Sequence, residues 1–230
     1  MLREVDGRTQ LWRSAEQAKD QSYVLGVLNQ AQLSRCLFPL GPDTAKADVR
    51  AEASARGLYL AKKPDSHDIC FIPSGDTAGV LAKHLGSSAG DFVDEQGVVV
   101  GSHAGSHAFT VGQRRGLHLG VPADDGRPRY VLGIEPTTNT VTVGPHEALA
   151  VRRIDGIRPT WAEAEVLGSW RGLVQVRAHG AALPAWIEGR TESITVLLDD
   201  ATHGIAPGQA VVCYDGDRVV GSATIAATAR

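Results

Sequence analysis

The sequence predicts an α+β protein in which a largely helical first part precedes a long run of strands and turns. Residues 10–60 space their leucines with a helical period, at Leu25, Leu28, Leu33 and Leu37. Beyond residue 150, short β-like runs recur at spacings of about 8–12 residues, which is typical of a small barrel or sandwich. We therefore expect boundaries near residues 75 and 150, which divide the chain into parts 1–74, 75–149 and 150–230.

The first part is expected to hold two helices. Ser14 is a suitable N-cap for the first, and Gln17 stands three residues later, as in a capping box. The stretch FPLGPDT breaks the helical pattern with two prolines and a glycine. The run KADVRAEASARGLYLA then predicts a second helix that ends at Gly57.

The remaining parts are expected to be rich in hairpins. The run DTAGVLAKHLG predicts a short helix closed by Gly86, and FVDEQGVVVG predicts two short strands joined by a polar turn. A second hairpin is expected around the turn at residues 136–139, because apolar and polar residues alternate on both sides. The pair Asp215-Gly216 is a strong signal for a third.

Composition narrows the function classes. Hydrophobic residues make up 43% and charged residues 21%, and the formal net charge is −3. These values fit a soluble globular protein, and any contact with nucleic acid has to come from a local patch. We expect no membrane segment and no signal peptide, because no apolar run is long enough and the first ten residues lack a leader pattern.

The cysteines are few, and the histidines lack metal-binding spacing. Cys36, Cys70 and Cys213 are odd in number and far apart, so a disulfide framework is not expected and a reducing cytoplasm is the expected compartment. From the pattern alone each is a buried thiol. His103, His107 and His118 come with no CxxC or HExxH motif, so no metal site is expected.

One glycine-rich stretch, GSHAGSHAFTVGQRRGLHLG at residues 101–120, carries adjacent arginines at Arg114 and Arg115. Glycine lets a backbone approach a phosphate closely, and arginine binds phosphate through two hydrogen bonds. Two interpretations stay open at this point. The stretch is either a loop that contacts RNA or covers an active site, or a hairpin with solvated arginines.

Four segments in order resemble the tRNA-specific 2-thiouridylase family over essentially the whole chain. They are KDQSYVL with FPLG and KADVR, then KKPDSHDICFIP, then residues 101–120 with RYVLGIEPTTNTVTVG, and finally APGQAVVCYDGDRVVG. The resemblance implies a helical remnant of a nucleotide-binding domain, a central domain and a terminal β-barrel. It also implies an enzyme that thiolates C2 of the wobble uridine in tRNA, using ATP with magnesium in its full form.

The resemblance also assigns roles to residues. Cys70 matches the cysteine that receives sulfur as a persulfide and pairs in a disulfide with a first catalytic cysteine as sulfur is released. The sulfur is implied to come from a cysteine desulfurase or a sulfur-relay protein. The residues implied to contact tRNA are Lys19, Asp20, Gln21, Arg114, Arg115, Arg177 and Gln209.

The sequence departs from the family in one respect. It contains no SGGVDS string and no glycine-rich phosphate loop, so we expect this chain by itself to be a truncated, inactive form of the enzyme. A non-catalytic tRNA-binding module is the alternative. A methyltransferase is a weaker one, because no glycine-rich turn for S-adenosylmethionine follows a strand.

Overall fold

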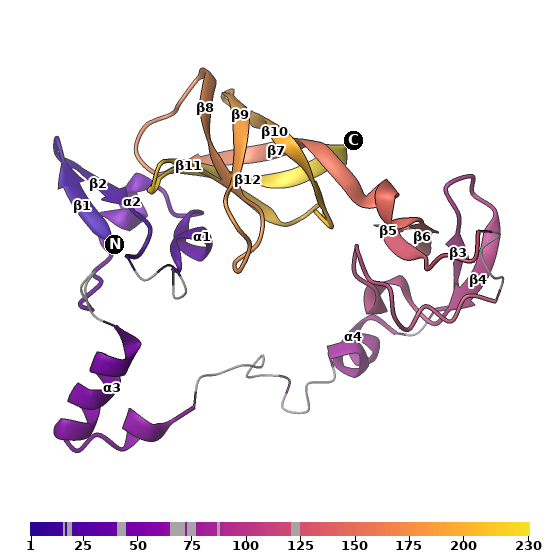
Figure 1. Ribbon diagram of the computed structural model, residues 1–230, viewed down its shortest axis with the longest axis horizontal. Coiled ribbons are helices and arrows are strands. Elements are labelled where there is room, and N and C mark those ends of the chain that lie inside the picture. The colour runs from indigo at the N-terminus through magenta and orange to yellow at the C-terminus, as the bar shows by residue number, and fades with distance from the viewer. Residues whose placement is uncertain are drawn as a thin grey trace. The chain divides into compact units, whose positions relative to one another are not determined.

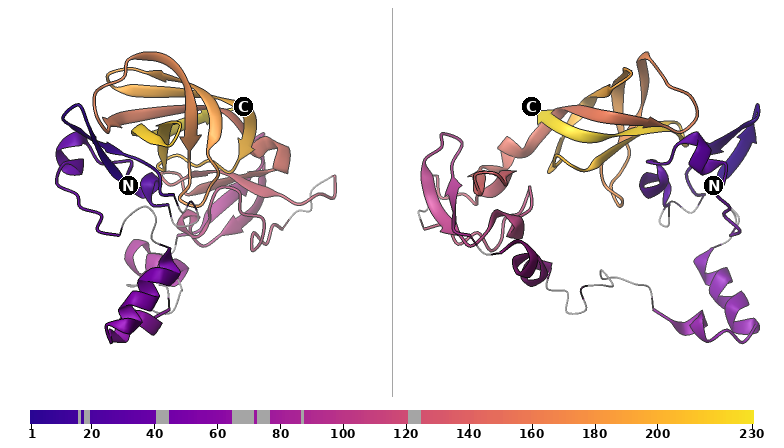
Figure 2. Two further views of the ribbon diagram at one scale, coloured as in Figure 1. Left: turned by 60° about the vertical axis from the view of Figure 1, so that its left-hand side comes forward. Right: turned by 180° about the vertical axis from the view of Figure 1, so that it is seen from behind.

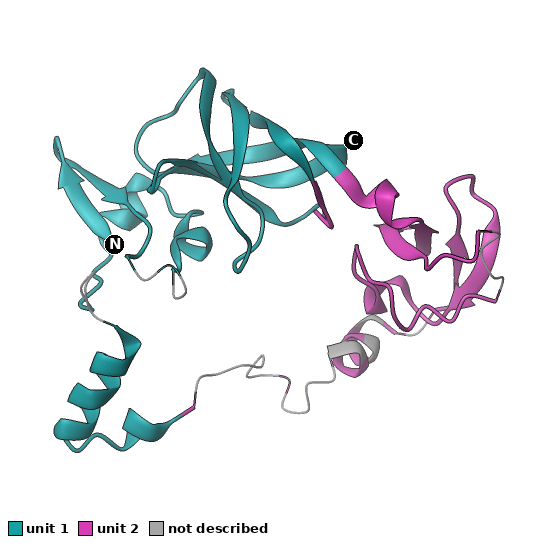
Figure 3. Cartoon of the chain, in the orientation of Figure 1, with its two compact units in different colours: residues 1–63, 151–201, 207–230 teal, residues 64–150, 202–206 magenta. Residues whose placement is uncertain are grey.

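A computed structural model of the chain describes residues 1–15, 17, 20–40, 45–64, 72, 77–86, 88–120 and 125–230. The chain forms two compact units, which Figure 3 colours separately. The first unit comprises residues 1–63, 151–201 and 207–230, and the second comprises residues 64–150 and 202–206. With short helices, small sheets and a closed β-barrel, the fold is α+β (Figure 1).

The N-terminal segment begins with a hairpin, not with the helix expected from residue 10. Its elements are β1 (Leu2–Val5), β2 (Arg8–Leu11), α1 (Ser22–Leu25), α2 (Gln30–Leu33), α3 (Lys46–Ala55) and the 3₁₀-helix η2 (Tyr59–Lys62). The prediction that Ser14 caps a helix is wrong, because Ser14 lies in an irregular stretch between β2 and α1.

The stretch whose leucine spacing predicted one helix contains two short helices, with Leu25 in α1 and Leu33 in α2, while Leu28 and Leu37 lie outside both. Asn29 caps α2, with its side chain accepting from the backbone N–H of Gln32 and the Gln32 side chain accepting in return. Such a reciprocal cap starts a new helix and so ends the preceding one. Gly26 closes α1, and a Cβ there would lie 2.7 Å from a Val212 methyl group, so only glycine permits this approach to the barrel.

The second predicted helix is present as α3. Gly57 follows it with φ +69°, the left-handed conformation that commonly ends a helix. None of the α3 residues is buried. A guanidinium nitrogen of Arg50 donates to the carbonyl of Lys63 at 3.2 Å, which ties α3 to the chain beyond η2.

The second unit is built on a four-stranded sheet. Its elements are α4 (Thr77–Leu85), β3 (Gly90–Val93), β4 (Val99–His103), η3 (Ser106–Ala108), β5 (Tyr130–Glu135), β6 (Thr140–Gly144) and η4 (His146–Leu149). The strand order is β4-β3-β6-β5, and β3 runs parallel to β6. Both predicted hairpins are confirmed, and the apolar cluster on the sheet is centred on Phe92, Val131, Val141 and Val143.

The rest of the chain closes into a six-stranded barrel (Figure 2). Its strands are β7 (Ala150–Trp161), β8 (Gly168–Gln175), β9 (Leu183–Gly189), β10 (Ser193–His203), β11 (Ala210–Asp215) and β12 (Arg218–Ala229). They pair in the order β10-β7-β12-β11-β8-β9. The hairpin predicted at Asp215-Gly216 is confirmed, with Gly216 at φ +58°. Among the described helices, none is long and apolar enough to cross a membrane.

The N-terminal segment packs directly on the barrel. Trp12 forms an isolated bridge with Arg218 of β12, and the backbone N–H of Arg13 donates to the Asp217 carbonyl at 2.8 Å. Leu11 and Leu33 join one buried cluster with barrel side chains from β11 and β12: Val212, Tyr214 and Val219. This apolar contact holds Arg13 and residues 20–23 against the barrel, where the site described below is formed.

The described cysteines differ in environment. Cys213 is fully buried in β11, which confirms the prediction of a core thiol. Cys36 is only half-buried and lines a cavity of about 330 Å³, so the same prediction for Cys36 is wrong. The difference arises because Cys36 follows α2 in an irregular stretch, whereas Cys213 is enclosed by neighbouring strands.

Burial of Cys213 predicts loss of stability in alkali. Burial raises the pKa of its thiol to about 12. In the unfolded chain the thiol ionises above its ordinary pKa of 9.0, while the folded chain keeps it protonated. The stability that the protonated thiol contributes is therefore fully present below pH 9. As the pH rises toward 12, the free energy of unfolding is expected to fall by at most about 4 kcal/mol from this group.

Urea unfolding at several pH values between 8 and 12 measures this loss (roughly the window set by the ordinary and raised thiol pKa). The Cys213→Ala variant is expected to show a shallower decline, with Cys36→Ala as the matched control. If the free energy of unfolding declined equally with pH in Cys213→Ala and in the parent chain, the buried thiol would not be the cause of the loss.

Candidate functional site

A chain of hydrogen bonds joins residues that are far apart in the sequence. The Ser22 hydroxyl donates to Asp20 Oδ2 at 2.6 Å and lies 3.2 Å from the Tyr214 hydroxyl. The Tyr214 hydroxyl donates to Gln175 Oε1 at 3.3 Å, and Gln175 Nε2 donates to the Arg177 carbonyl at 2.8 Å. The network therefore connects the segment before α1 with the loop after β8.

Asp20 organises the turn that enters α1. Its Oδ1 accepts from the backbone N–H groups of Ser14, at 2.9 Å, and Ser22, at 3.1 Å. With the Ser22 hydroxyl on Oδ2, the half-buried carboxylate holds three hydrogen bonds within its own segment. Gln21 is exposed at the N-cap position of α1, and its side chain makes no capping bond.

This geometry predicts that Asp20 acts mainly on folding. Asp20→Ala removes the acceptor of three hydrogen bonds and is expected to lower the free energy of unfolding by roughly 2 kcal/mol. Asp20→Asn keeps an oxygen for the backbone donors and is expected to lose less. Urea denaturation of the two variants tests the ranking. Equal stability of Asp20→Ala and the parent chain would show that these bonds contribute little.

Arg13 is fixed between Tyr214 and Gln175. Its guanidinium lies 4.0 Å from the centre of the Tyr214 ring, a cation–π arrangement, and Nη2 donates to Gln175 Oε1 at 3.1 Å. Burial also raises the pKa of the Tyr214 hydroxyl, which therefore stays protonated as a donor. Arg13 Nε is buried and has no acceptor among the described residues.

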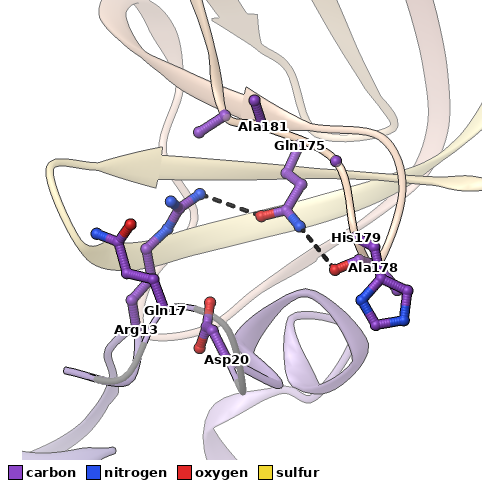
Figure 4. A pocket seen from close by; sticks show the side chains of 9 residues that line it. Arg13, Gln17, Asp20, Gln175, Ala178, His179 and Ala181 are labelled. Carbon is purple, nitrogen blue, oxygen red and sulfur yellow. Dashed lines mark hydrogen bonds between the residues drawn. The ribbon is translucent and has the colours of Figure 1, made fainter.

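A polar cavity of about 530 Å³ opens between this segment and the loop after β8 (Figure 4). It lies entirely within the first unit. Its lining residues are Arg13, Gln17, Asp20, Gln175, Ala178, His179, Gly180, Ala181 and Ala182. Small residues form the loop side of the cavity, which leaves room for a ligand.

Two of the predicted tRNA contacts lie beside this network. Arg177 is exposed at the start of the loop after β8. Gln209 is exposed in the turn before β11, where Gly208 has φ +87° and the Gln209 carbonyl accepts from Ile225 N at 2.8 Å. The Tyr23 hydroxyl donates to the next carbonyl, that of Ala210, at 3.0 Å, so α1 also contacts this turn.

Arg114 and Arg115 lie in the second unit, on an ordered loop between β4 and β5. Both side chains are exposed, and neither forms an ion pair with another described residue. Gln113 braces the loop, because its side chain accepts from Thr110 N at 3.1 Å and donates to the Arg115 carbonyl at 2.9 Å. The loop is also tied to β5, whose Val131 N–H donates to the Gln113 carbonyl at 2.9 Å.

The histidines of this stretch have no metal-site geometry. His103 packs edge-on against Phe92 and Phe109, with ring centres 4.9 and 5.2 Å away. Burial lowers its pKa, and its Nδ1 accepts from the backbone N–H of Gly105. Within the described ranges, no group of three or more His, Cys, Asp or Glu side chains is placed to hold a metal ion.

Cys70 and Lys19 lie outside the residues that the structure describes. Of the other predicted site residues, Asp20, Gln21, Arg177 and Gln209 share the first unit, and the arginine pair belongs to the second. Sequence reasoning missed Arg13, Gln175 and Tyr214. Tyr214 falls within the APGQAVVCYDGDRVVG segment, but nothing in that segment marked it as a site residue, and Arg13 and Gln175 belong to none of the quoted segments. The three meet because the N-terminal segment packs on a closed barrel.

Three family models match consecutive parts of the chain. Residues 2–74 match a tRNA methyl transferase HUP domain, residues 78–145 a tRNA methyl transferase PRC-barrel domain, and residues 151–225 an aminomethyltransferase β-barrel domain. Together they extend over nearly the whole chain in the order expected for one protein family.

Curated relatives match at high identity. The tRNA-specific 2-thiouridylase MnmA of Cutibacterium acnes is 58% identical over 98% of this chain and 62% of its own length. Those of Streptomyces avermitilis (56%) and Acidothermus cellulolyticus (57%) match 98% and 96% of this chain, and 60% and 61% of their own lengths. The chain thus spans about three fifths of the length of these relatives. It belongs to the tRNA-specific 2-thiouridylase family.

Proposed function

We propose that the chain provides the sulfur-carrying and tRNA-binding functions of a tRNA 2-thiouridylase. The observation that carries the proposal is the 58% identity, over 98% of the chain, to a protein named for that activity. We further propose a functional division of the chain into the domains 1–74, 75–149 and 150–230, of which the first packs on the third. The setting is the cytoplasm, where thiols stay reduced.

Cys70 is proposed as the sulfur carrier. Its thiolate attacks the terminal sulfur of a donor persulfide, the donor S–S bond breaks, and the donor cysteine leaves as a thiolate. A cysteine desulfurase or a sulfur-relay protein is the proposed donor. In the full enzyme the terminal sulfur would bond to C2 of the wobble uridine, and the activated oxygen would leave C2. The thiolate of another cysteine would then attack the inner Cys70 sulfur, which breaks the persulfide S–S bond, leaves the outer sulfur on the uridine and forms a disulfide.

ATP, with magnesium, would supply activation of the uridine oxygen in the full enzyme. The described residues of this chain do not fit that role. The N-cap residues of α1, α2 and α3 are Gln21, Asn29 and Ala45, and none opens a glycine-rich phosphate loop. We therefore assign no step of the activation to this chain, and we propose that the chain alone does not thiolate tRNA.

The tRNA-binding role is proposed for exposed groups in both units. Arg114 and Arg115 stand on a braced loop, and Arg177 and Gln209 border the network around Tyr214. Gln21, which is exposed, and Lys19, which lies outside the described residues, complete the proposed contacts from the KDQ segment. Asp20 belongs to the same segment, and the three hydrogen bonds that its carboxylate accepts favour a part in which it orders the turn that carries Gln21, while Oδ2 keeps room for one more donor.

Two other functions compete with this proposal. The descriptions of two family models favour a methyltransferase, but the curated relatives at 53–58% identity are named 2-thiouridylases. A non-catalytic tRNA-binding module would share the same contacts and lack sulfur transfer. Replacing the matching region of the Cutibacterium acnes enzyme with this chain separates these possibilities.

We expect the chimera to thiolate tRNA when supplied with ATP and a sulfur donor. A folded chimera that binds tRNA but transfers no sulfur would favour the binding module. Methyl transfer from S-adenosylmethionine by the chimera would favour the methyltransferase.

A further inference from the structure

We propose that the cavity between the N-terminal segment and the loop after β8 binds one unpaired nucleobase of an RNA. The inference rests on the proposed function, because it names a contact for the same tRNA. The residues proposed to hold the base are Arg13, Gln17, Asp20 and His179. Of these four, only Asp20 belongs to the tRNA contacts proposed above.

Counting hydrogen bonds separates the fixed wall from the groups left for a ligand. The Gln175 amide is saturated: Oε1 accepts from Arg13 and Tyr214, and Nε2 donates to two backbone carbonyls, those of Arg177 and Ala178. Gln175 is also buried, so it serves as a rigid back wall. It positions Arg13 and the loop but has no hydrogen-bonding capacity left for a ligand.

The other polar groups of the cavity keep spare capacity. Asp20 Oδ2 accepts one hydrogen bond, although a carboxylate oxygen has room for two. The Arg13 guanidinium has five N–H groups and makes one hydrogen bond to another described residue. The side chains of Gln17 and His179 are both exposed at the cavity, and neither side chain hydrogen-bonds to another described residue.

This combination fits a nucleobase better than a phosphate. A phosphate carries only acceptors and would meet the Asp20 carboxylate as well as Arg13, so repulsion would offset part of the attraction. A base edge carries N–H donors beside carbonyl or ring-nitrogen acceptors. The donors suit Asp20, and the acceptors suit Arg13 and the Gln17 amide.

Shape and net charge agree with this choice. A cavity of about 530 Å³ has room for a whole nucleoside. One side of it is formed by residues without bulky side chains, Gly180, Ala181 and Ala182, and the imidazole of His179 offers a flat face for stacking. A chain with a formal net charge of −3 cannot rely on general phosphate attraction, so a placed base contact accounts for selective RNA binding.

Filling the cavity tests the proposal without changing any charge. Ala181 is exposed at the cavity, and Ala181→Trp places an indole where the base would lie. The matched control is Ala227→Trp, at an exposed position of β12 outside the cavity lining. His179→Ala is the second variant, which removes the proposed stacking face from an exposed position and should fold normally.

Filter binding with tRNA, at matched salt, is expected to show about a tenfold loss of affinity for Ala181→Trp and a smaller loss for His179→Ala. Ala227→Trp is expected to bind like the parent chain. A short oligouridylate should also bind more tightly than an abasic ribose-phosphate oligomer of equal length, because both carry the same phosphates.

The outcomes distinguish failure of the base site from failure of the proposed tRNA-binding function on which it rests. If the parent chain binds tRNA and both cavity variants bind it equally well, the base site is wrong and the proposed function is unaffected. Equal binding of oligouridylate and the abasic oligomer would also overturn the base site, because it would show contact with phosphates alone. Failure of the parent chain to bind tRNA at all would overturn the tRNA-binding function together with the inference.

Discussion

Replacing Cys70 with serine is expected to abolish the loading of sulfur onto the chain. A hydroxyl is far less acidic than a thiol and a poor nucleophile toward sulfur, so serine cannot take a sulfane sulfur from a donor persulfide. The chain is incubated with a cysteine desulfurase and cysteine, and intact-protein mass spectrometry detects the added sulfur. We expect one added sulfur atom on the parent chain and none on Cys70→Ser.

The other cysteines provide matched controls. Cys213 is buried with its pKa raised to about 12, so it presents no thiolate near neutral pH. Cys213→Ala is therefore expected to load sulfur like the parent chain. Cys36 is half-buried, and its Sγ donates to the Gln32 carbonyl at 3.4 Å. Loss of loading in Cys36→Ser with retention in Cys70→Ser would reverse our assignment of the sulfur carrier.

The barrel was the part of the fold most open to prediction from sequence. Strand β9 and the first half of β10 alternate buried and more exposed residues, β11 and β12 contain continuous buried runs, and Asp215-Gly216 marks the hairpin between β11 and β12. Strand β7 carries a weaker strand signal, because its sequence contains charged residues together with Gly156 and Pro159. Gly156 is required there, since a Cβ would lie 2.8 Å from that of Ala223 in β12.

The N-terminal segment shows how a local signal loses to a competing one. Asp6-Gly7 has the same turn signal as Asp215-Gly216, and both residues adopt positive φ, at 49° and 74°. This turn forms the hairpin of β1 and β2, which extends to Leu11. The leucine spacing had predicted a helix from residue 10. The leucine spacing reflects burial only in part. Leu33 is fully buried, whereas the side chain of Leu37 is 84% exposed.

The site was only partly predictable for a physical reason. The KDQ segment and Arg177 carry signals from the family resemblance, whereas Gln175 and Tyr214 resemble ordinary strand residues until the barrel closes. Closure places β8 beside β11, with Tyr214 opposite Leu173 and Val212 opposite Gln175. Long-range pairing of this kind is set by the whole fold and leaves no mark in a short stretch of sequence.

Replacing both Arg114 and Arg115 with alanine is expected to weaken tRNA binding by about thirtyfold at low salt. Each guanidinium contact with a phosphate contributes roughly 1 kcal/mol at an exposed site, and both would be lost. Nothing in the described structure pairs with either side chain, so their removal should not lower stability. The Gln113 brace keeps the loop in place in the variant, because it uses backbone groups of Thr110 and Arg115.

The matched control is Arg127→Ala with Arg129→Ala, which removes the same charge from the same unit. Arg127 and Arg129 are already paired, with Glu147 at 3.8 Å and Asp125 at 2.9 Å, so they have less to offer a phosphate. Filter binding at several salt concentrations, with tRNA and an unstructured RNA of equal length, gives both affinity and salt slope. Loss of two phosphate contacts should flatten the slope by somewhat less than two units in the test pair and by less in the control. Equal affinity of the two RNAs for the parent chain, or equal losses in the two double variants, would show that the loop does not hold a folded tRNA. A selective loss in the test pair would assign the phosphate contact to the loop that Gln113 braces.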